Sequence, residues 1–201
     1  VIEAGGTFTG GTGTHKLGAV TLNSSSNQFT FSSGTTYLTG RSSSGNQYKV
    51  FNNFTAGKVT AAGTQIVDQA RTPTSIRCDD TTGINILTMN SGTGRVLHLE
   101  DDLTVGGNLT VSAGTVSTRN VADNTDSDLT VTGGNISVSG TLLLNNSTVA
   151  VSDTSSALSI SNVGTVTCGD TNLTVNALSL GQGPFTAPSA SGSFIITGEK
   201  D

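Results

Sequence analysis

The sequence predicts an all-β protein and, within that class, a parallel β-helix (β-solenoid) of short strands. The main observation is a repeat: residues 103–111 read LTVGGNLTV, and residues 129–138 read LTVTGGNISV. A looser third unit begins at Leu158, so the starts lie 26 residues (129 − 103) and 29 residues (158 − 129) apart. Self-similarity with a period of about 20–50 residues indicates a solenoid, a propeller or another repeat array.

Short alternating segments within these units predict the strands. Two apolar residues flank one polar residue in pairs such as Leu109/Val111 and Ile136/Val138, and Gly, Asn, Ser and Asp separate the pairs. Alternation over so few residues is typical of a very short strand with one inward face. Three such strands joined by turns would make one coil, and neighbouring coils would hydrogen-bond at a spacing of about 4.8 Å.

An antiparallel β-sandwich is the alternative fold. Gly-Gly and Gly-Asn are typical of hairpin turns, so residues 103–111 could also form one tight hairpin. Its arms would have about three residues each, whereas strands usually have about five or six.

The composition fits an all-β chain with a neutral, polar surface. At 201 residues the chain is long enough for one domain or for a rod of about seven coils. Ser and Thr make up more than a quarter of the sequence, and 26 residues are Gly. Only 11% of the residues are charged, where about 25% is typical. Thr and Val favour pleated strands, Gly, Asn and Ser favour turns, and strong helix formers are scarce.

The charge pattern argues against some partners. The net charge is −5, and residues 103–201 carry only two cations, Arg119 and Lys200. A nucleic-acid surface needs clustered Lys and Arg, so nucleic acid is not an expected partner. Every apolar run is shorter than the roughly 18 residues that a membrane-spanning helix needs, so the sequence predicts no membrane span.

Three regions follow one another along the chain. They are an irregular N-terminal β region (1–102), regular solenoid repeats (103–183), and a C-terminal linker with a terminal strand (184–201). All three could also form one domain. Residues 17–56 hold strand-like pieces separated by Ser, Asn and Gly. Residues 57–78 are the one place where a short helix fits, although a strand fits there equally well.

Both ends of the chain carry candidate contacts with another subunit. Residues 1–16 are rich in Gly and Thr, and residues 185–193 read as a linker before a last apolar strand at 193–197. Termini of small polar residues rarely order without packing. An isolated apolar strand must also pack, either as a cap of the solenoid or on the open edge of the next subunit. The predicted contact residues are Val1, Ile2, Phe8, Phe185, Phe194, Ile195 and Ile196.

The best candidate for a ligand site is an acidic turn between two repeats. It contains Asp123, Asn124, Asp126 and Asp128, and oxygen side chains in such an alternating pattern can surround Ca²⁺. The pattern begins like an EF-hand loop, but Leu129 stands where the Gly of that loop belongs. A solvated acidic turn without a metal is the alternative. The sequence predicts no other cofactor.

Sequence motifs of common catalytic sites are missing. The chain has no Gly-x-Ser-x-Gly, His-Glu-x-x-His, Cys-x-x-Cys or phosphate-binding Gly-Lys motif, and its two histidines, His15 and His98, lie far apart. Cys78 and Cys168 are 90 positions apart. In a solenoid this separation is about three coils, or roughly 14 Å, which is too far for a disulfide. The solenoid therefore predicts two unbonded cysteines, each a small buried hydrophobe.

The LTVGGNLTV run and its echo at 129–138 resemble repeats of secreted β-solenoid proteins. Autotransporter passenger domains, filamentous adhesins, and bacteriophage tail fibres and tailspikes carry similar runs. Residues 103–180 carry this resemblance. It implies an extracellular, cell-surface or virion-surface fibre that is not an enzyme and that is built from copies of the chain.

Two other functions stay open. A receptor-binding phage fibre or an adhesin would hold glycans on aromatic residues of a polar β surface. The candidates are Tyr37, Tyr48, Phe51 and Phe54, although core filling explains these residues as well. The repeats also resemble the scaffold of polysaccharide lyases, but no clustered Asp with Arg or Lys supports that enzymatic activity.

Overall fold

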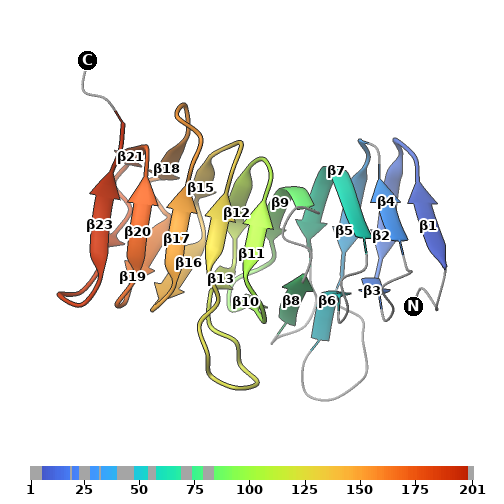
Figure 1. Ribbon diagram of the computed structural model, residues 1–201, viewed down its shortest axis with the longest axis horizontal. Coiled ribbons are helices and arrows are strands. Elements are labelled where there is room, and N and C mark those ends of the chain that lie inside the picture. Colours follow the sequence, from blue (N-terminus) through green and yellow to red (C-terminus); the bar gives the residue numbers. More distant parts are fainter. Residues whose placement is uncertain are drawn as a thin grey trace.

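The chain forms a stack of short strands, seen from the side in the computed structural model in Figure 1. The structure describes residues 6–18, 20–22, 28–31, 33–39, 48–53, 58–68, 74–78 and 84–198. Within these residues the chain has 23 strands and no helix. Every ladder between two of these strands is parallel. The predicted all-β parallel β-helix is therefore confirmed.

The strands lie on three faces of the solenoid. The first face holds β1 (Thr7–Gly10), β4 (Gln28–Phe31), β11 (Leu103–Val105), β14 (Leu129–Val131), β17 (Thr148–Val151), β20 (Asn172–Val175) and β23 (Ser193–Ile196). The second face holds β2 (Thr14–Leu17), β5 (Thr35–Leu38), β12 (Leu109–Ala113), β15 (Ile136–Val138), β18 (Ala157–Ile160) and β21 (Ala177–Leu180). Two longer strands, β7 (Lys58–Val67) and β9 (Ile84–Asn90), belong to both faces because each pairs with strands of both.

The third face is a separate sheet with one strand from each coil. Its eight strands are β3 (Val20–Leu22), β6 (Tyr48–Asn53), β8 (Thr74–Cys78), β10 (Val96–Leu99), β13 (Thr115–Ser117), β16 (Thr141–Asn145), β19 (Thr165–Cys168) and β22 (Phe185–Thr186). Seven turns of the chain thus separate β3 from β22, in agreement with the predicted number of coils. Strands β11 and β12 pair with strands of neighbouring coils and not with each other. The alternative prediction of an antiparallel sandwich is therefore wrong.

Successive coils pair in register, so that similar residues lie side by side. Leu103 lies beside Leu129, as the 26-residue spacing predicts. The next level differs, because Leu129 lies beside Val149, only 20 residues on (149 − 129), and Leu158 lies beside Ile136 on the second face. The predicted start of a third repeat at Leu158 is therefore wrong. The coils vary in length because their turns do, while the strands of successive coils stay paired in register.

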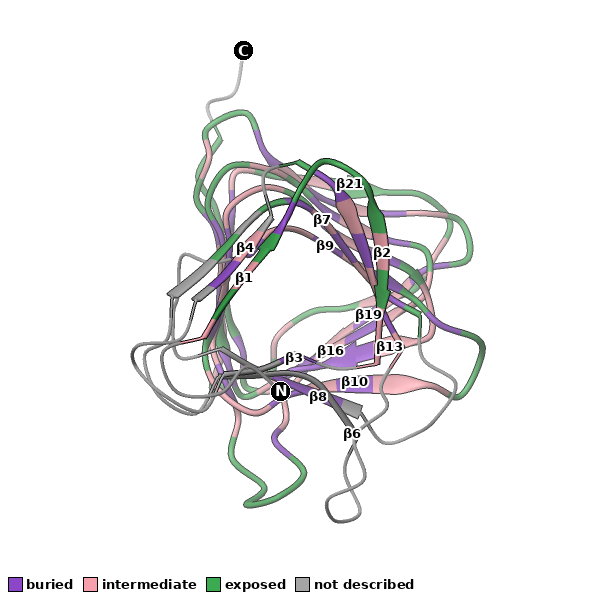
Figure 2. Ribbon diagram, turned by 90° about the vertical axis from the view of Figure 1, so that its right-hand side faces the viewer, coloured by how far each residue is buried: buried purple, intermediate pink, exposed green. Residues whose placement is uncertain are grey.

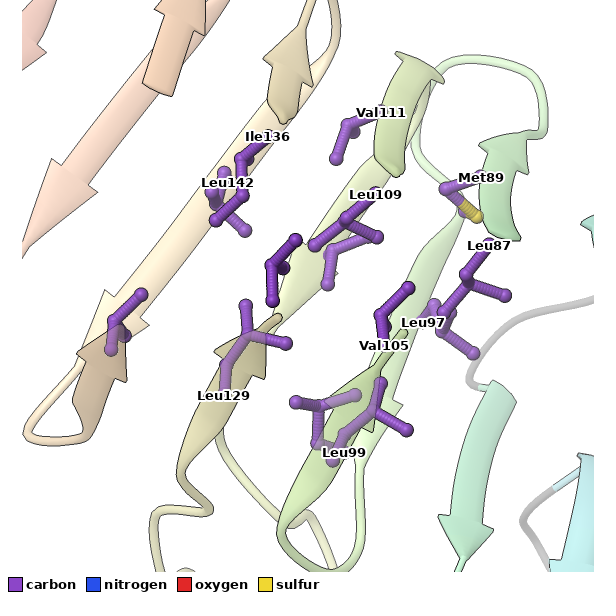
Figure 3. Packing of buried hydrophobic residues seen from close by; sticks show 14 of the residues in the cluster. Leu87, Met89, Leu97, Leu99, Val105, Leu109, Val111, Leu129, Ile136 and Leu142 are labelled. Atoms are coloured by element: carbon purple, nitrogen blue, oxygen red, sulfur yellow. The ribbon is translucent and has the colours of Figure 1, made fainter. Parts of the chain in front are cut away.

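The core consists of apolar rows that run along the inside of the solenoid. Most strands that carry these rows alternate: Leu129 and Val131 in β14 are 0% exposed, while Thr130 between them is half-buried. Side chains from the three faces point into the same interior, as Leu109 and Leu142 do in Figure 3. Figure 2 looks along the axis of the solenoid, with the buried positions on the strands that surround this interior. Burial of each such side chain contributes about 1.5–3 kcal/mol, so these rows are the main source of stability.

Side-chain oxygens at the corners connect each coil to the next. Asn108 Oδ1 accepts a hydrogen bond from the backbone N–H of Asn135 (2.9 Å), and Asn135 Oδ1 accepts one from Ala157 (2.7 Å). At another corner Asp128 donates its N–H to Asp102 Oδ1 (2.8 Å), and its own carboxylate accepts from Thr148 (2.7 Å). These bonds satisfy backbone donors that the strand ladders do not reach. Asn and Asp at the turns therefore hold neighbouring coils in register.

Glycines at other corners allow neighbouring backbones to come close. A Cβ added to Gly134 would lie 2.6 Å from the carbonyl carbon of Gly107 and 2.8 Å from the backbone nitrogen of Asn108. Both atoms can move only if the whole neighbouring coil moves. The Gly-Gly pair that also indicates a hairpin is here a requirement of coil stacking.

We therefore expect Gly134→Ala to lower the free energy of unfolding by about 1–3 kcal/mol, the range for overpacked sites. Urea unfolding followed by circular dichroism measures the change. Gly92→Ala is the matched control, since a Cβ there meets no atom within 4 Å. Equal losses for the two variants would contradict a role for Gly134 in coil stacking.

The predicted regions meet without a break in the ladders. Strand β9 pairs with β7 before the proposed boundary at 102 and with β11 and β12 after it. Segment 57–78, where a helix and a strand fitted equally well, contains β7 and β8, and its residues 69–73 lie outside the described residues. None of the described residues belongs to a helix long and apolar enough to cross a membrane.

The C-terminal segment belongs to the solenoid. Strand β22 pairs with β19, and β23 pairs with β20. The prediction of a linker at 185–193 is therefore wrong for residues 185–186, while the predicted last strand is confirmed. Sequence reasoning missed β22 because it has only two residues, too few for any alternation to be visible.

Candidate functional site

The C-terminal end of the solenoid exposes the last members of the inward rows on the first face. Phe194 and Ile196 in β23 lie beside Leu173 and Val175 in β20. Leu173 and Val175 are 0% exposed, whereas Phe194 and Ile196 are 36% and 53% exposed. The same inward position is thus covered in one coil and open in the next, because no further coil follows β23 within the described chain.

The second face ends in the same way. Leu180 in β21 lies beside Ile160 in β18, and its exposed fraction is 52% against 3% for Ile160. From the third face Phe185 is partly buried against the core, with its ring 5.6 Å from that of Phe194. We call Leu180, Phe194 and Ile196 the end surface. Its members belong to the last strands of two faces, and Leu180 and Ile196 lie 16 positions apart (196 − 180) in the sequence.

Ile195 lies on the other side of the same strand. It lies beside Thr174, and Thr174 lies beside Ala150. This row faces outward. Ile195 is 49% exposed. The three neighbours 194–196, all predicted to contact another subunit, therefore divide into two inward positions and one outward position.

The three strands at this end carry no charged residue, and Glu199, Lys200 and Asp201 follow within five positions of Ile196. Residues 171–198 contain no Asp, Glu, Lys or Arg. Natural proteins usually protect an open sheet edge with charged side chains, above all Lys, or with bulges. Here the edge strands β21, β22 and β23 carry no such charge, so another chain could bury them at little cost in charge desolvation.

The N-terminal end is less open. Phe8 in β1 stacks on Phe29 in β4 with ring centroids 5.5 Å apart, and Phe8 is partly buried against the core. Within the described residues, β1, β2 and β3 each pair with one strand only, namely β4, β5 and β6. The other two predicted N-terminal contact residues, Val1 and Ile2, lie outside the described residues.

The acidic turn holds its carboxylates in separate hydrogen bonds. Asp123 accepts from the N–H (3.0 Å) and the hydroxyl (2.6 Å) of Thr125, and these bonds hold the pKa of Asp123 below its ordinary value. Asp126 pairs with Arg119 through Nε (3.2 Å) and Nη2 (3.4 Å). Asp128 accepts from the next coil, as described above.

The structure therefore gives three of the four predicted calcium ligands, Asp123, Asp126 and Asp128, other partners. Asn124 adopts a left-handed backbone conformation with φ of 60°, which fits a tight turn. Among the described residues, no three His, Cys, Asp or Glu side chains form a group that could hold a metal ion. Calcium binding by Asp123, Asn124, Asp126 and Asp128 stays a prediction of the sequence alone.

Cys168 carries a free, buried thiol. The prediction that it forms no disulfide within the chain is confirmed for this residue, while the side chain of Cys78 lies outside the described residues. Burial raises the pKa of the Cys168 thiol from 9.0 to about 11.

Cys168 is therefore expected to resist alkylation in the folded protein. A pKa higher by about two units lowers the thiolate fraction at pH 8 roughly a hundredfold, and burial hinders access as well. Iodoacetamide labelling with peptide mapping should find Cys168 unmodified in buffer and fully modified in urea. Rapid labelling in buffer would contradict the buried position.

A small group of ionisable side chains, His98, Glu100, Arg119 and Asp126, lies around the end of β10, with Ser75 Oγ donating to Glu100 Oε1 (2.5 Å) and Asp126 paired with Arg119. His98 is half-buried, its Nδ1 lies 3.0 Å from the Arg119 carbonyl oxygen, and burial lowers its pKa. A shallow groove of about 270 Å³ lies at the corner between the second and third faces. The groove is lined by Gly, Ser, Thr, one Ala and Val163, without a titratable side chain.

Of the four aromatic residues considered for glycan binding, one is described with its side chain. Tyr37 lies in β5, between the buried Thr36 and Leu38, so it faces outward and is half-buried. Tyr48 and Phe51 lie in β6 with side chains outside the described residues, as is all of Phe54. Glycan binding stays a prediction.

Comparison with protein-family models, with curated proteins and with solved structures finds no match. The functional argument therefore depends on the geometry of the chain itself. The residue that sequence reasoning missed is Leu180. It becomes recognisable once the register of the second face is known, because it continues the row of Val138 and Ile160.

Proposed function

We propose that the protein is a non-enzymatic structural subunit of an extracellular, homo-oligomeric fibre in which copies join end to end. The observation that carries this proposal is the exposure of Leu180, Phe194 and Ile196 at positions that are buried in every preceding coil from β11 and β12 on. The apolar core exposed at this end of the described solenoid is a surface that the next copy can cover.

The open strand edges supply the second part of the joint. An unpaired edge presents a row of N–H and C=O groups, and an added strand satisfies them. In the assembly, β23 of one copy lies beside β1 of the next copy and continues the first face. Because every ladder between the described strands is parallel, a second copy that is shifted along the axis without inversion continues the same hydrogen-bond pattern.

The assembly is open-ended. The C-terminal end of one copy and the N-terminal end of the next are different surfaces, and a joint between different surfaces generates a filament unless its rotation closes a ring. The scarcity of charges, 11% of the residues, allows copies to approach closely. The hydroxyl-rich exterior and the resemblance to secreted solenoids support an extracellular location.

Sedimentation velocity over a wide range of protein concentrations tests this proposal. We expect the average mass to rise with concentration, and the frictional ratio to rise with it because the particles lengthen. A concentration-independent monomer would contradict the proposal. A closed particle of one fixed size would contradict filament formation. The remaining hypothesis would then be a receptor-binding oligomer.

A further inference from the structure

One inward row of the second face is polar at the N-terminal end of the solenoid and aliphatic further along. In register, its first three members are His15, Thr36 and Gln65, and the fourth is Leu87. The following members are Leu109, Ile136, Leu158 and Leu178. The N-terminal coils thus place polar side chains where all later coils place aliphatic ones.

Two of these polar side chains are fully enclosed. Thr36 is 0% exposed and Gln65 is 2% exposed. Thr36 Oγ1 and Gln65 Nε2 are both buried and have no hydrogen-bond partner in the protein. Buried polar atoms without partners cost free energy, and in folded proteins almost all of them are bonded to protein or to ordered water.

On their own face, Thr36 and Gln65 lie next to an apolar row. The parallel inward row on the same face is apolar, with Leu38 beside Val67, and both are buried in the core. Thr36 and Gln65 lie on adjacent strands, where paired backbones are about 4.8 Å apart. A group between the two side chains can therefore reach both of them.

The chemistry of the pair fits water better than an ion. The Gln65 amide nitrogen only donates, whereas the Thr36 hydroxyl both donates and accepts. A water molecule can accept from Gln65 Nε2 and donate to Thr36 Oγ1, so that both atoms gain a partner. Neither residue carries a charge, and a bare ion enclosed by neutral groups would be costly.

We propose that the N-terminal part of the solenoid interior binds ordered water between Thr36 Oγ1 and Gln65 Nε2. The polar row begins in the first coil at His15, which is half-buried, so the water site lies between the second and third coils. The solenoid then has an apolar interior from Leu87 onward and a hydrated segment before it. This inference is independent of the proposed end-to-end assembly.

The test is a high-resolution crystal structure together with a double-mutant cycle. We expect one ordered water within hydrogen-bond distance of both Thr36 Oγ1 and Gln65 Nε2, and no water in Thr36→Val/Gln65→Met. Each single variant, Thr36→Val or Gln65→Met, should lower the melting temperature by several degrees. The double variant should regain most of the loss, because it leaves no unpaired polar atom.

Ser91→Ala is the matched control. The Ser91 hydroxyl is also buried, but it donates to the Val67 carbonyl oxygen at 3.1 Å, so its removal should not change the water. A direct hydrogen bond between Thr36 and Gln65 without water between them would overturn the proposal. So would losses that simply add in the double variant, since shared water requires the two side chains to be coupled.

Discussion

Ile196→Lys is expected to abolish end-to-end assembly and to leave the subunit folded. Ile196 lies at the open end of an inward row, beside the buried Val175. A lysine there reaches solvent in the single subunit, because the position is 53% exposed. In the assembly the same ammonium group would be enclosed by the core of the next copy, where an unpaired charge is strongly disfavoured. Mass measurement in solution should find only monomers at concentrations at which the wild type forms long particles.

Ile195→Lys is the matched control for this prediction. Ile195 is on the same strand and similarly exposed, at 49%, but it lies in an outward row. The control should assemble like the wild type, and circular dichroism should be the same for all three proteins. If both lysine variants still assemble, the end surface is not the joint. If only Ile195→Lys fails, copies associate through the outer face of the sheet.

Leu142→Ala is expected to lower the free energy of unfolding by about 2–5 kcal/mol, the range for buried Leu→Ala substitutions. Leu142 lies on the third face between Val116 and Val166, and its exposed fraction is 0%. Neighbours on both sides of the row hold the space open, so the cavity cannot collapse easily. In repeat proteins each coil is stabilised by its nearest neighbours. The substitution therefore also destabilises the coils before and after the one that contains Leu142.

Leu143→Ala is the comparison variant, because it truncates a side chain on the outward side of the same strand. Leu143 is half-buried and lies between the outward Ser117 and Thr167, so its truncation leaves no enclosed cavity and should cost less than about 1 kcal/mol. Urea unfolding of both variants gives the comparison. Similar losses for the two variants would contradict the assignment of inward and outward rows.

The fold could be predicted because its local signals agree. Alternation in Leu129–Val131 fixes which side chains turn inward, and turns of Gly, Asn and Asp are needed wherever the chain changes face. The 26-residue copy of Leu103 at Leu129 showed the register directly. The later coils could not be aligned in this way, since Leu158 and Leu129 both begin an apolar–polar–apolar triplet although they lie on different faces. Triplets from different faces look alike in sequence, and only the pairing of backbones separates them.

The candidate surfaces were predictable only in part. The apolar run Phe194-Ile195-Ile196 stands out in a neutral sequence, but which of its residues face inward depends on the register with β20. Leu180 looks like any core leucine, and its exposure follows from its place in the last coil of the second face. The acidic turn is the opposite case, since its sequence points to a site more clearly than its structure does. Its composition resembles a calcium loop, yet Asp126 pairs with Arg119, a contact that the sequence pattern does not reveal.

Negative-stain electron microscopy of the purified full chain tests end-to-end assembly most directly. The proposed joint continues the first face, which has nine described strands in each copy when β7 and β9 are included, and at about 4.8 Å per strand one copy adds roughly 43 Å to the length of a fibre. We therefore expect unbranched filaments with an axial repeat near this value, which are absent for Ile196→Lys. Uniform single particles at high protein concentration, or filaments with an unrelated repeat, would contradict a joint between the ends of the solenoid.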